Sequence, residues 1–422
     1  MRARRPKKAA GPSSAAGGAG FARDGQRPRA GATAGALGPY ARARLEVHAL
    51  GLKLPLDVPA DVFATRAIDD GTLLLLRNLP DRAPASFLDL GCGYGALGLP
   101  VAARHPGARA LLVDRDLLAV RAAAHNARSL CLGNVEVRPG LGYRGLEDAR
   151  FELILCNVPA RIGPRGVAYL LDAGRPLLAP GGELRAVVIR DLREQVEAAA
   201  VPGVRLVAER RNHVVYSAPP GPSRFALDDE AVYARDETRI EAAPGTVLTL
   251  SRPHDASEDP GHASALAALL DALPRTAPRK VLCFRCGYGP LPLAVRVRWP
   301  DALVVAQDRD LLDTAFLRRN AAKLGLGGER LRIAETVFPS EALPEGGAAL
   351  VLGETSASAG EAVFARELLD ARDALAPGGE ALVLASEKQA REWRPRLAAS
   401  GGTVLLRRGG ACVLRIARPM GA

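Results

Sequence analysis

The sequence lacks any long apolar segment. Its longest apolar runs, such as Thr72–Leu76, are far too short to cross a bilayer, and no apolar signal-peptide core stands near the N-terminus. Aromatic residues make up only 4% of the 422 residues, while Ala, Gly, Arg and Pro are plentiful, which we attribute to coding bias rather than to function. The sequence therefore indicates no membrane-spanning or secreted protein.

Disulfide spacing and several catalytic motifs are missing as well. The chain has six cysteines, mostly inside apolar or glycine-rich segments, which favours a reducing cytoplasm. Cys283 and Cys286 have zinc-like spacing, but a closed site needs four ligands and no second pair follows, so we expect no metal. No G-x-S-x-G motif, carboxylate pair or P-loop is present.

The positive charge of the chain is concentrated at its N-terminus. Residues 1–44 carry +9 of the net charge of +11. Residues 1–40 are rich in Gly, Ala, Ser, Pro and Arg without apolar periodicity, which predicts a disordered basic tail. Such a tail could be a solubilising extension or an arm that attracts RNA phosphates; its glycines make a transit peptide the least favoured alternative.

The rest of the chain is an internal repeat. Phe87–Leu132 and Lys280–Leu326 share C-G-Y-G, an apolar stretch ending in D-R-D-L-L, and an asparagine twelve residues beyond the first aspartate of that motif. The offset is 194, so Asp114 corresponds to Asp308. A-P-G-G-E and a closing hairpin pattern recur later in both copies. These matches indicate a duplication.

Each copy alternates short apolar strands with helical patterns. The first copy has four expected strands and two expected helices: Phe87–Leu90, Ala110–Val113, Glu152–Cys156 and Glu183–Ile189, then Leu117–Ser129 and Tyr169–Leu178. This alternation predicts an α/β fold with a mostly parallel, doubly wound sheet and an antiparallel hairpin at one edge. We predict two tandem Rossmann-like domains, over 45–217 and 236–420, joined by a linker over 218–235. Each begins with a smaller segment of strands and one helix, over 45–80 and 236–275.

A glycine-rich loop carries the first chemical signal. The loop, residues 89–95, follows a strand and precedes a helix, where glycines let a ligand approach the backbone closely. Its spacing also satisfies the dinucleotide fingerprint G-x-G-x-x-A. However, Asp89 stands before the first glycine, where a cationic amino acid moiety would need it, and a third glycine gives D-x-G-x-G-x-G. Both features favour S-adenosylmethionine; the alternative is a tight turn without a ligand.

An acid ends the next strand. Asp114 stands 23 residues after Gly91, the spacing expected of a carboxylate that accepts both ribose hydroxyls of a nucleoside cofactor. We expect Asp116 to cap the helix that begins at Leu117, and capping is also the alternative for Asp114. The predicted cofactor-binding residues are Asp89, Leu90, Gly91, Cys92, Gly93, Gly95, Asp114 and Arg115.

A third motif, Asn157-Val158-Pro159-Ala160, ends a later strand at the sheet edge where ligands bind. With the glycine loop, it resembles class I methyltransferases acting on exocyclic amines, and more closely the tandem-domain family that methylates guanine N2 in ribosomal RNA. The stretch from Val62 to Leu76 is similar to that family's lead-in, and the resemblance covers about residues 45–420. It implies S-adenosylmethionine as cofactor and structured RNA, in particular ribosomal RNA, as substrate.

The sequence departs from that family in two ways. The family's amine-binding motif is N-P-P followed by an aromatic, so one proline and the aromatic are missing here. In that family the second copy usually carries the catalysis, whereas here the second copy is degenerate: Cys283 replaces Asp89, Arg285 replaces Gly91, and 352–355 reads L-G-E-T. We therefore predict an active first domain and a second domain that buttresses it or helps to hold the substrate.

The resemblance implies catalytic roles for Asn157, Val158 and Pro159. The Asn157 side-chain oxygen and the Val158 carbonyl would accept the two N–H bonds of the amine and turn its lone pair toward the methyl group. Asn157 could instead cap a turn. The adenine amine would be held near Glu136 or near Gly140–Leu141, and the sequence does not decide between them.

Two rival functions follow from the departures. The missing aromatic at Ala160 and the near-neutral charge outside the tail favour a methyltransferase acting on a small molecule or a protein. The other rival is a non-catalytic cofactor-binding module.

Overall fold

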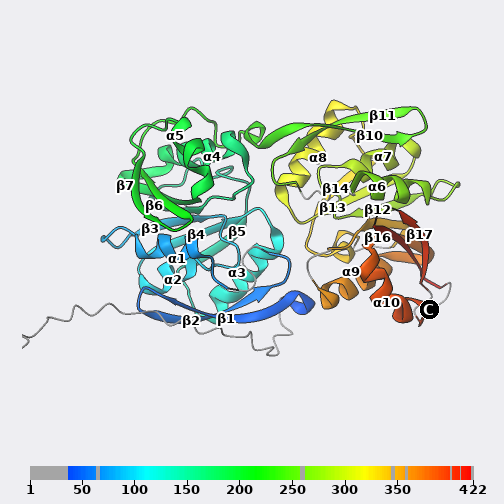
Figure 1. The fold of residues 1–422 in the computed structure, drawn as a ribbon, viewed down its shortest axis with the longest axis horizontal. Helices are drawn as coiled ribbons and strands as arrows, with labels where there is room; N and C mark the ends of the chain where they lie inside the picture. The colour runs from blue at the N-terminus through cyan, green and yellow to red at the C-terminus, as the bar shows by residue number, and fades with distance from the viewer. Residues whose placement is uncertain are drawn as a thin grey trace, which may run out of the picture.

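The computed structural model describes residues 37–62, 67–256, 262–343, 347–356, 360–399, 402–408 and 410–419. The chain forms two α/β units lying side by side, each built on a seven-stranded sheet (Figure 1). Most of the predicted tail, residues 1–36, lies outside the described residues. The prediction of disorder fails at the end of this tail, because Leu37 and Tyr40 are buried, with exposed fractions of 1% and 2%. Both residues lie in or next to the 3-10 helix η1 (Gly38–Tyr40).

The first half contains a hairpin, one helix and then the sheet with its helices. After η1 its elements are β1 (Ala41–Ala49), β2 (Leu52–Pro59), α1 (Asp70–Arg77), β3 (Ser86–Leu90), α2 (Gly98–Arg104), β4 (Arg109–Asp114), α3 (Leu117–Ser129), β5 (Val135–Pro139), β6 (Phe151–Asn157), α4 (Gly163–Asp172), η2 (Arg175–Leu177), β7 (Leu178–Ile189), η3 (Arg190–Leu192), α5 (Arg193–Ala198), β8 (Arg205–Arg210) and β9 (His213–Ala218). The sheet order is β5-β4-β3-β6-β7-β9-β8, with β9 and β8 antiparallel at the edge.

The second half repeats this arrangement. Its elements are η4 (Glu230–Tyr233), β10 (Ala234–Ala243), β11 (Thr246–Pro253), α6 (His262–Asp271), β12 (Lys280–Phe284), α7 (Pro290–Arg298), β13 (Leu303–Asp308), α8 (Leu311–Lys323), β14 (Leu331–Glu335), η5 (Pro339–Ala342), β15 (Ala348–Glu354), α9 (Glu361–Asp373), β16 (Leu375–Ser386), α10 (Glu387–Ala399), β17 (Thr403–Arg408) and β18 (Ala411–Ala417). The sheet order is β14-β13-β12-β15-β16-β18-β17, the same as in the first half. The predicted duplicated α/β fold is therefore confirmed, and the predicted domain limits stay predictions.

Local sequence signals account for the elements nearest the site. Helix α3 has the predicted bounds, and the Asp116 side chain accepts the Leu118 N–H at its N-terminus, 2.9 Å away. The predicted helix cap at Asp116 is therefore confirmed. Strands β3, β4 and β6 each lie within one residue of the predicted limits.

The helix predicted over Tyr169–Leu178 is placed too late in the sequence. The structure has α4 over Gly163–Asp172, with Pro164 in the first turn, where its missing N–H costs nothing. Pro176 follows the helix, and 175–178 belong to η2 and the start of β7.

The repeated asparagine has a structural role. Asn126 is fully buried on α3; its Nδ2 donates to the carbonyls of Asp57 and Tyr94, and its Oδ1 accepts the Asp57 N–H. Asn320 makes the same three contacts in the second half. Each asparagine thus fastens its hairpin to its glycine loop.

The segment before each hairpin packs against the opposite half. The Tyr233 ring of η4, in the predicted linker, lies 5.8 Å from the Tyr169 ring of α4. Likewise, the Tyr40 hydroxyl of η1 donates to Glu367 of α9 at 3.4 Å. Each half therefore packs its leading segment against the other half, so the contact between the halves is not limited to the chain segment that joins them.

Candidate functional site

Three predicted motifs meet at one edge of the first sheet. Strands β3, β4 and β6 are parallel neighbours, so their carboxyl ends lie together. The glycine loop follows β3, Asp114 ends β4, and Asn157 ends β6. The structure therefore brings the predicted cofactor-binding and catalytic residues to one place.

The glycine loop leaves open space beside its backbone. Gly91 and Gly93 have φ of 76° and 56°, a region that favours glycine, and a Cβ added at either would meet no atom within 4 Å. The Gly91 N–H donates to the Val113 carbonyl at 2.8 Å, which ties the loop to β4. A ligand could therefore lie directly against this backbone, in the space that a side chain at either position would fill.

Asp89 lies fully buried beneath this loop. Its Oδ2 accepts the Gly98 N–H at 2.7 Å, at the start of α2, while its Oδ1 has no hydrogen-bond partner among the described residues. Burial raises the pKa of Asp89 to about 7, and the nearby Asp114 carboxylate adds to this, although the Gly98 N–H opposes it. An unpaired, buried carboxylate oxygen suits a cationic ligand group.

Asp114 connects the glycine loop to the turn after β4. Its Oδ2 accepts the Gly93 N–H at 2.7 Å and its Oδ1 accepts the Asp116 N–H at 2.9 Å. Burial raises the pKa of Asp114, whereas these two N–H donors lower it. Its side chain is partly exposed, so its remaining acceptor positions can face a ligand.

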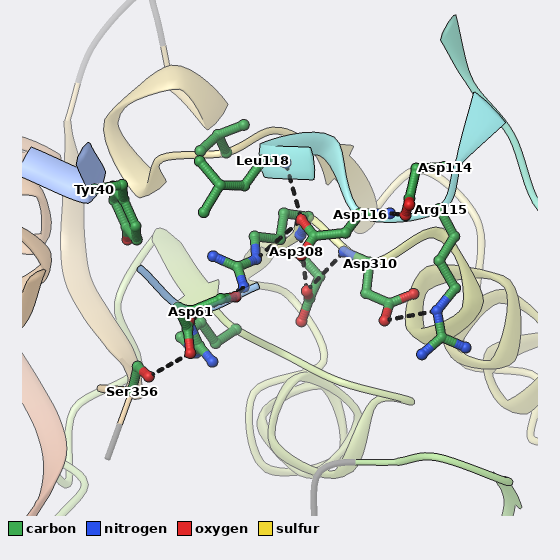
Figure 2. A network of polar contacts seen from close by, with 12 residues as sticks. Tyr40, Asp61, Asp114, Arg115, Asp116, Leu118, Asp308, Asp310 and Ser356 are labelled. Carbon is green, nitrogen blue, oxygen red and sulfur yellow. Dashed lines mark hydrogen bonds and ion pairs between the residues drawn. The ribbon is translucent and has the colours of Figure 1, made fainter. Parts of the chain in front are cut away.

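The other predicted cofactor residues lie around these groups. Leu90 and Cys92 are buried, so only their backbone could face a ligand. Arg115 turns its side chain to the second half, where it pairs with Asp310 at 3.3 Å (Figure 2). It also pairs with Asp255 at 2.6 Å. Arg115 could therefore contribute only its backbone to the cofactor site.

Asn157 is anchored to helix α1. Its Nδ2 donates to Asp69 Oδ2 at 2.8 Å and to Thr72 Oγ1 at 3.0 Å. Both donor positions are used, so its Oδ1 is left as the available acceptor and accepts from no described residue. Val158 is buried and its N–H donates to the Val187 carbonyl, while Pro159 and Ala160 are exposed.

The two anchors of Asn157, Asp69 and Thr72, were not among the predicted site residues. Asp69 caps α1 by accepting the Thr72 N–H at 3.0 Å, so an Asp-x-x-Thr pattern before an apolar run marks the pair as a helix start. That pattern gives no sign of a contact with a residue 88 positions later.

The two candidates for holding an adenine amine lie at different ends of β5. The Gly140 N–H donates to the Asp114 carbonyl at 3.0 Å, so Gly140–Leu141 lies at the same edge as the site. Glu136 is exposed near the opposite end of β5. Of the two alternatives, the structure favours Gly140–Leu141.

The corresponding place in the second half holds an ion-pair cluster. Arg285, at the position of Gly91, donates from Nη1 to Asp61 at 3.0 Å and to Glu367 at 3.2 Å. Ser356 donates from its hydroxyl to the other Asp61 oxygen at 2.8 Å (Figure 2). Burial alone would raise the pKa of Asp61, but Arg285 and Arg309 hold it below its usual value. Protein side chains thus occupy the place that is open in the first half.

None of the described helices is both long and apolar enough to span a membrane. No cluster of three or more His, Cys, Asp or Glu suited to a metal is found in the same part of the chain.

The first half of the chain is similar to known methyltransferases. Residues 53–217 match the model of the methyltransferase small domain family. The ribosomal RNA large subunit methyltransferase G of Pseudomonas fluorescens is 35% identical over 196 residues, 44% of this chain and 51% of that protein. The ribosomal RNA small subunit methyltransferase C of Hahella chejuensis is 33% identical over 172 residues, 37% of this chain and 47% of that protein. The chain spans about half the length of the curated relatives it matches.

A solved structure matches nearly the whole chain. The 16S rRNA N2 methyltransferase of T. Thermophilus, in complex with AdoMet and guanosine, superposes with a TM-score of 0.65 at 20% identity, covering 90% of this chain and 99% of that one. The chain therefore has the fold of this solved structure, with two tandem Rossmann-like domains. Within it, residues 53–217 are the part that matches the methyltransferase small domain family.

Proposed function

We propose that this protein transfers a methyl group from S-adenosylmethionine to an exocyclic base amine of ribosomal RNA. The observation that carries the proposal is the anchored Asn157 amide, which leaves a free acceptor oxygen at the sheet edge that also holds Asp89 and Asp114. The small-domain match and the ribosomal RNA methyltransferases among the relatives support the reaction and the substrate class.

The residues of the first half fit the cofactor. S-adenosylmethionine supplies a sulfonium-activated methyl group when bound. The unpartnered Oδ1 of Asp89 suits its ammonium group, and Asp114 suits its ribose hydroxyls. The open backbone at Gly91 and Gly93 permits the close approach that such a ligand needs.

Asn157 would orient the nucleophile. An aromatic amine has its lone pair delocalised into the ring, so the chain must hold both N–H groups to turn the lone pair out of conjugation. The Asn157 Oδ1 and the Val158 carbonyl are the acceptors for this purpose, and Pro159 shapes the segment. Two hydrogen bonds to α1 fix the amide before substrate binds, which limits the entropy lost on binding.

The direct test is methyl transfer from labelled cofactor to unmodified total RNA, followed by nucleoside analysis. We expect label in an N2-methylated guanosine of ribosomal RNA. Label only in small molecules or protein would support the rival substrate class, which the exposed Ala160 in place of an aromatic favours. Cofactor binding without any transfer would support the non-catalytic module.

Asp114→Ala should weaken S-adenosylmethionine binding by about 1–3 kcal/mol, roughly 5- to 150-fold, because the ribose hydroxyls lose their acceptor. The matched change Asp308→Ala should cost much less affinity, because Arg285 and its partners occupy the second site. Any loss would be indirect, since the Asp308 Oδ1 accepts the Asp310 N–H. Isothermal titration measures both affinities and should give one cofactor per chain; a stoichiometry near two would show that the second half binds as well.

Deleting residues 1–36 should reduce RNA affinity and flatten its dependence on salt, since most of the net charge precedes residue 45. The cut preserves Leu37 and Tyr40, which are buried, so cofactor affinity should stay the same. RNA binding measured at several salt concentrations checks this, and an unchanged salt slope would place the RNA contacts elsewhere.

A further inference from the structure

The D-R-D segments of the two halves lie side by side and contact each other (Figure 2). The Leu117 N–H donates to the Arg309 carbonyl at 3.0 Å, and the Leu311 N–H donates to the Arg115 carbonyl at 3.0 Å. The two hydrogen bonds are equivalent, because Leu117 and Arg115 of the first half correspond to Leu311 and Arg309 of the second. The repeat therefore has a local two-fold relation at this point.

The side chains of these segments cross in the same way. Arg115 Nε lies 3.3 Å from Asp310, and Arg309 Nε lies 3.2 Å from Asp116. Between them, Asp116 and Asp310 form an isolated antiparallel backbone bridge. We call the four residues Arg115, Asp116, Arg309 and Asp310 the crossed clasp.

A second carboxylate holds each arginine of the crossed clasp. Asp255, just after the hairpin of the second half, lies 2.6 Å from Arg115, and Asp61, just after the first hairpin, lies 3.1 Å from Arg309. Burial would lower the pKa of Arg115, but the carboxylates of Asp310 and Asp255 raise it above its usual value. Both acids that hold Arg115 thus belong to the second half.

The crossed clasp is continuous with the candidate cofactor site. Asp114 immediately precedes it, and the Asp114 Oδ1 accepts the N–H of Asp116. Residues 115 and 116 are therefore held by the second half while the residue before them presents a carboxylate to the first-half site.

We propose that the second half positions Asp114 for the cofactor through the crossed clasp, so that the first-half site is incomplete without the second half. This inference rests on the proposed function, because Asp114 matters only if a ribose binds there. It also accounts for D-R-D-L-L in the copy whose glycine loop is degenerate, since that motif supplies Arg309 and Asp310.

The test is the double variant Asp255→Asn/Asp310→Asn. Asparagine at 310 can still cap α8, where the Asp310 side chain accepts the Leu312 N–H, and asparagine tolerates the φ of 65° at 255. Both substitutions remove the charge that holds Arg115. Isothermal titration should show S-adenosylmethionine affinity reduced by roughly 5- to 50-fold, within the usual range of coupling between sites. RNA affinity and kcat at saturating cofactor should be unchanged.

Arg121→Gln is the matched control. Arg121 also forms an ion pair between the halves, with Glu341 at 3.0 Å, but it lies on α3, and its guanidinium stacks over the Phe338 ring rather than on the Asp114–Asp116 turn. Its cofactor affinity should equal that of the wild type. Arg115→Gln should match the double variant, and combining all three substitutions should weaken binding no further, because both changes break the same contact.

The outcomes separate this proposal from the proposed function. A wild-type protein that fails to bind S-adenosylmethionine defeats the proposed function and the inference with it. Wild-type binding with unchanged affinity in the double variant overturns the inference alone. An equal loss in Arg121→Gln, or additive losses in the triple variant, would also overturn it, since the effect would then reflect general loosening of the two halves.

Discussion

Replacing Asn157 with alanine should lower kcat by roughly 100-fold or more while S-adenosylmethionine affinity changes little. The Oδ1 of Asn157 is the acceptor held ready for the substrate amine, because both Nδ2 hydrogens are bound to Asp69 and Thr72. Single-turnover methylation of RNA measures the rate, and isothermal titration measures the cofactor affinity.

The control is an asparagine whose role is structural. Asn134 donates to three backbone carbonyls, of Ala102, His105 and Ala108, so Asn134→Ala should lower the melting temperature but not the rate per folded molecule. If Asn157→Ala turns over as fast as the wild type, Asn157 has no part in the mechanism.

The contacts of Asn157 also change what aspartate would do there. From the sequence, Asn157→Asp should keep part of the activity, because a carboxylate still accepts a hydrogen bond. In the structure, the new carboxylate would face Asp69 Oδ2 across 2.8 Å, and two carboxylates so close cannot both ionise. We therefore expect Asn157→Asp to keep part of the activity only while the two carboxyls share a proton, so its rate should fall as the pH rises. The exchange Asp69→Asn/Asn157→Asp restores a donor between the two positions, and asparagine remains a good helix cap, so it should recover part of the rate.

Gly91→Arg should weaken S-adenosylmethionine binding by at least about 100-fold, or about 2.7 kcal/mol. The added side chain would enter the open space beside the loop, as Arg285 does at the matching position of the second half. The backbone should tolerate the change, because Arg285 adopts a φ of 47°, although an L-residue at such a φ costs roughly 1–2 kcal/mol. Isothermal titration and a melting curve separate lost affinity from lost stability.

Gly181→Arg provides the matched control for strain. Gly181 has a φ of 75°, is exposed, and stands near the amino end of β7, at the sheet edge opposite the site. The variant should show similar destabilisation with wild-type cofactor affinity. Normal affinity in Gly91→Arg would mean that the cofactor does not lie along the glycine loop.

Prediction from the sequence succeeded where the signals are local. Helix α3 has its predicted bounds because Asp116 caps it and its apolar positions keep a helical period. The prediction failed at α4, because the apolar run Tyr169–Leu178 spans the end of one helix and the start of β7, and periodicity does not mark where a buried helix changes to a buried strand. Pro176 and Pro164 were the signals that place this helix earlier.

The sequence by itself determined the duplication, the sheet class and the edge that holds Asp89, Asp114 and Asn157, because strand order and glycine spacing follow from short-range patterns. Only the tertiary structure decided that Asp69 anchors Asn157 and that Arg115 belongs to the crossed clasp. Those contacts join residues between 88 and 195 positions apart. These contacts depend on how the two sheets and their hairpins pack. The local sequence around a charged residue in a turn is the same whether that residue faces a ligand or an opposing carboxylate.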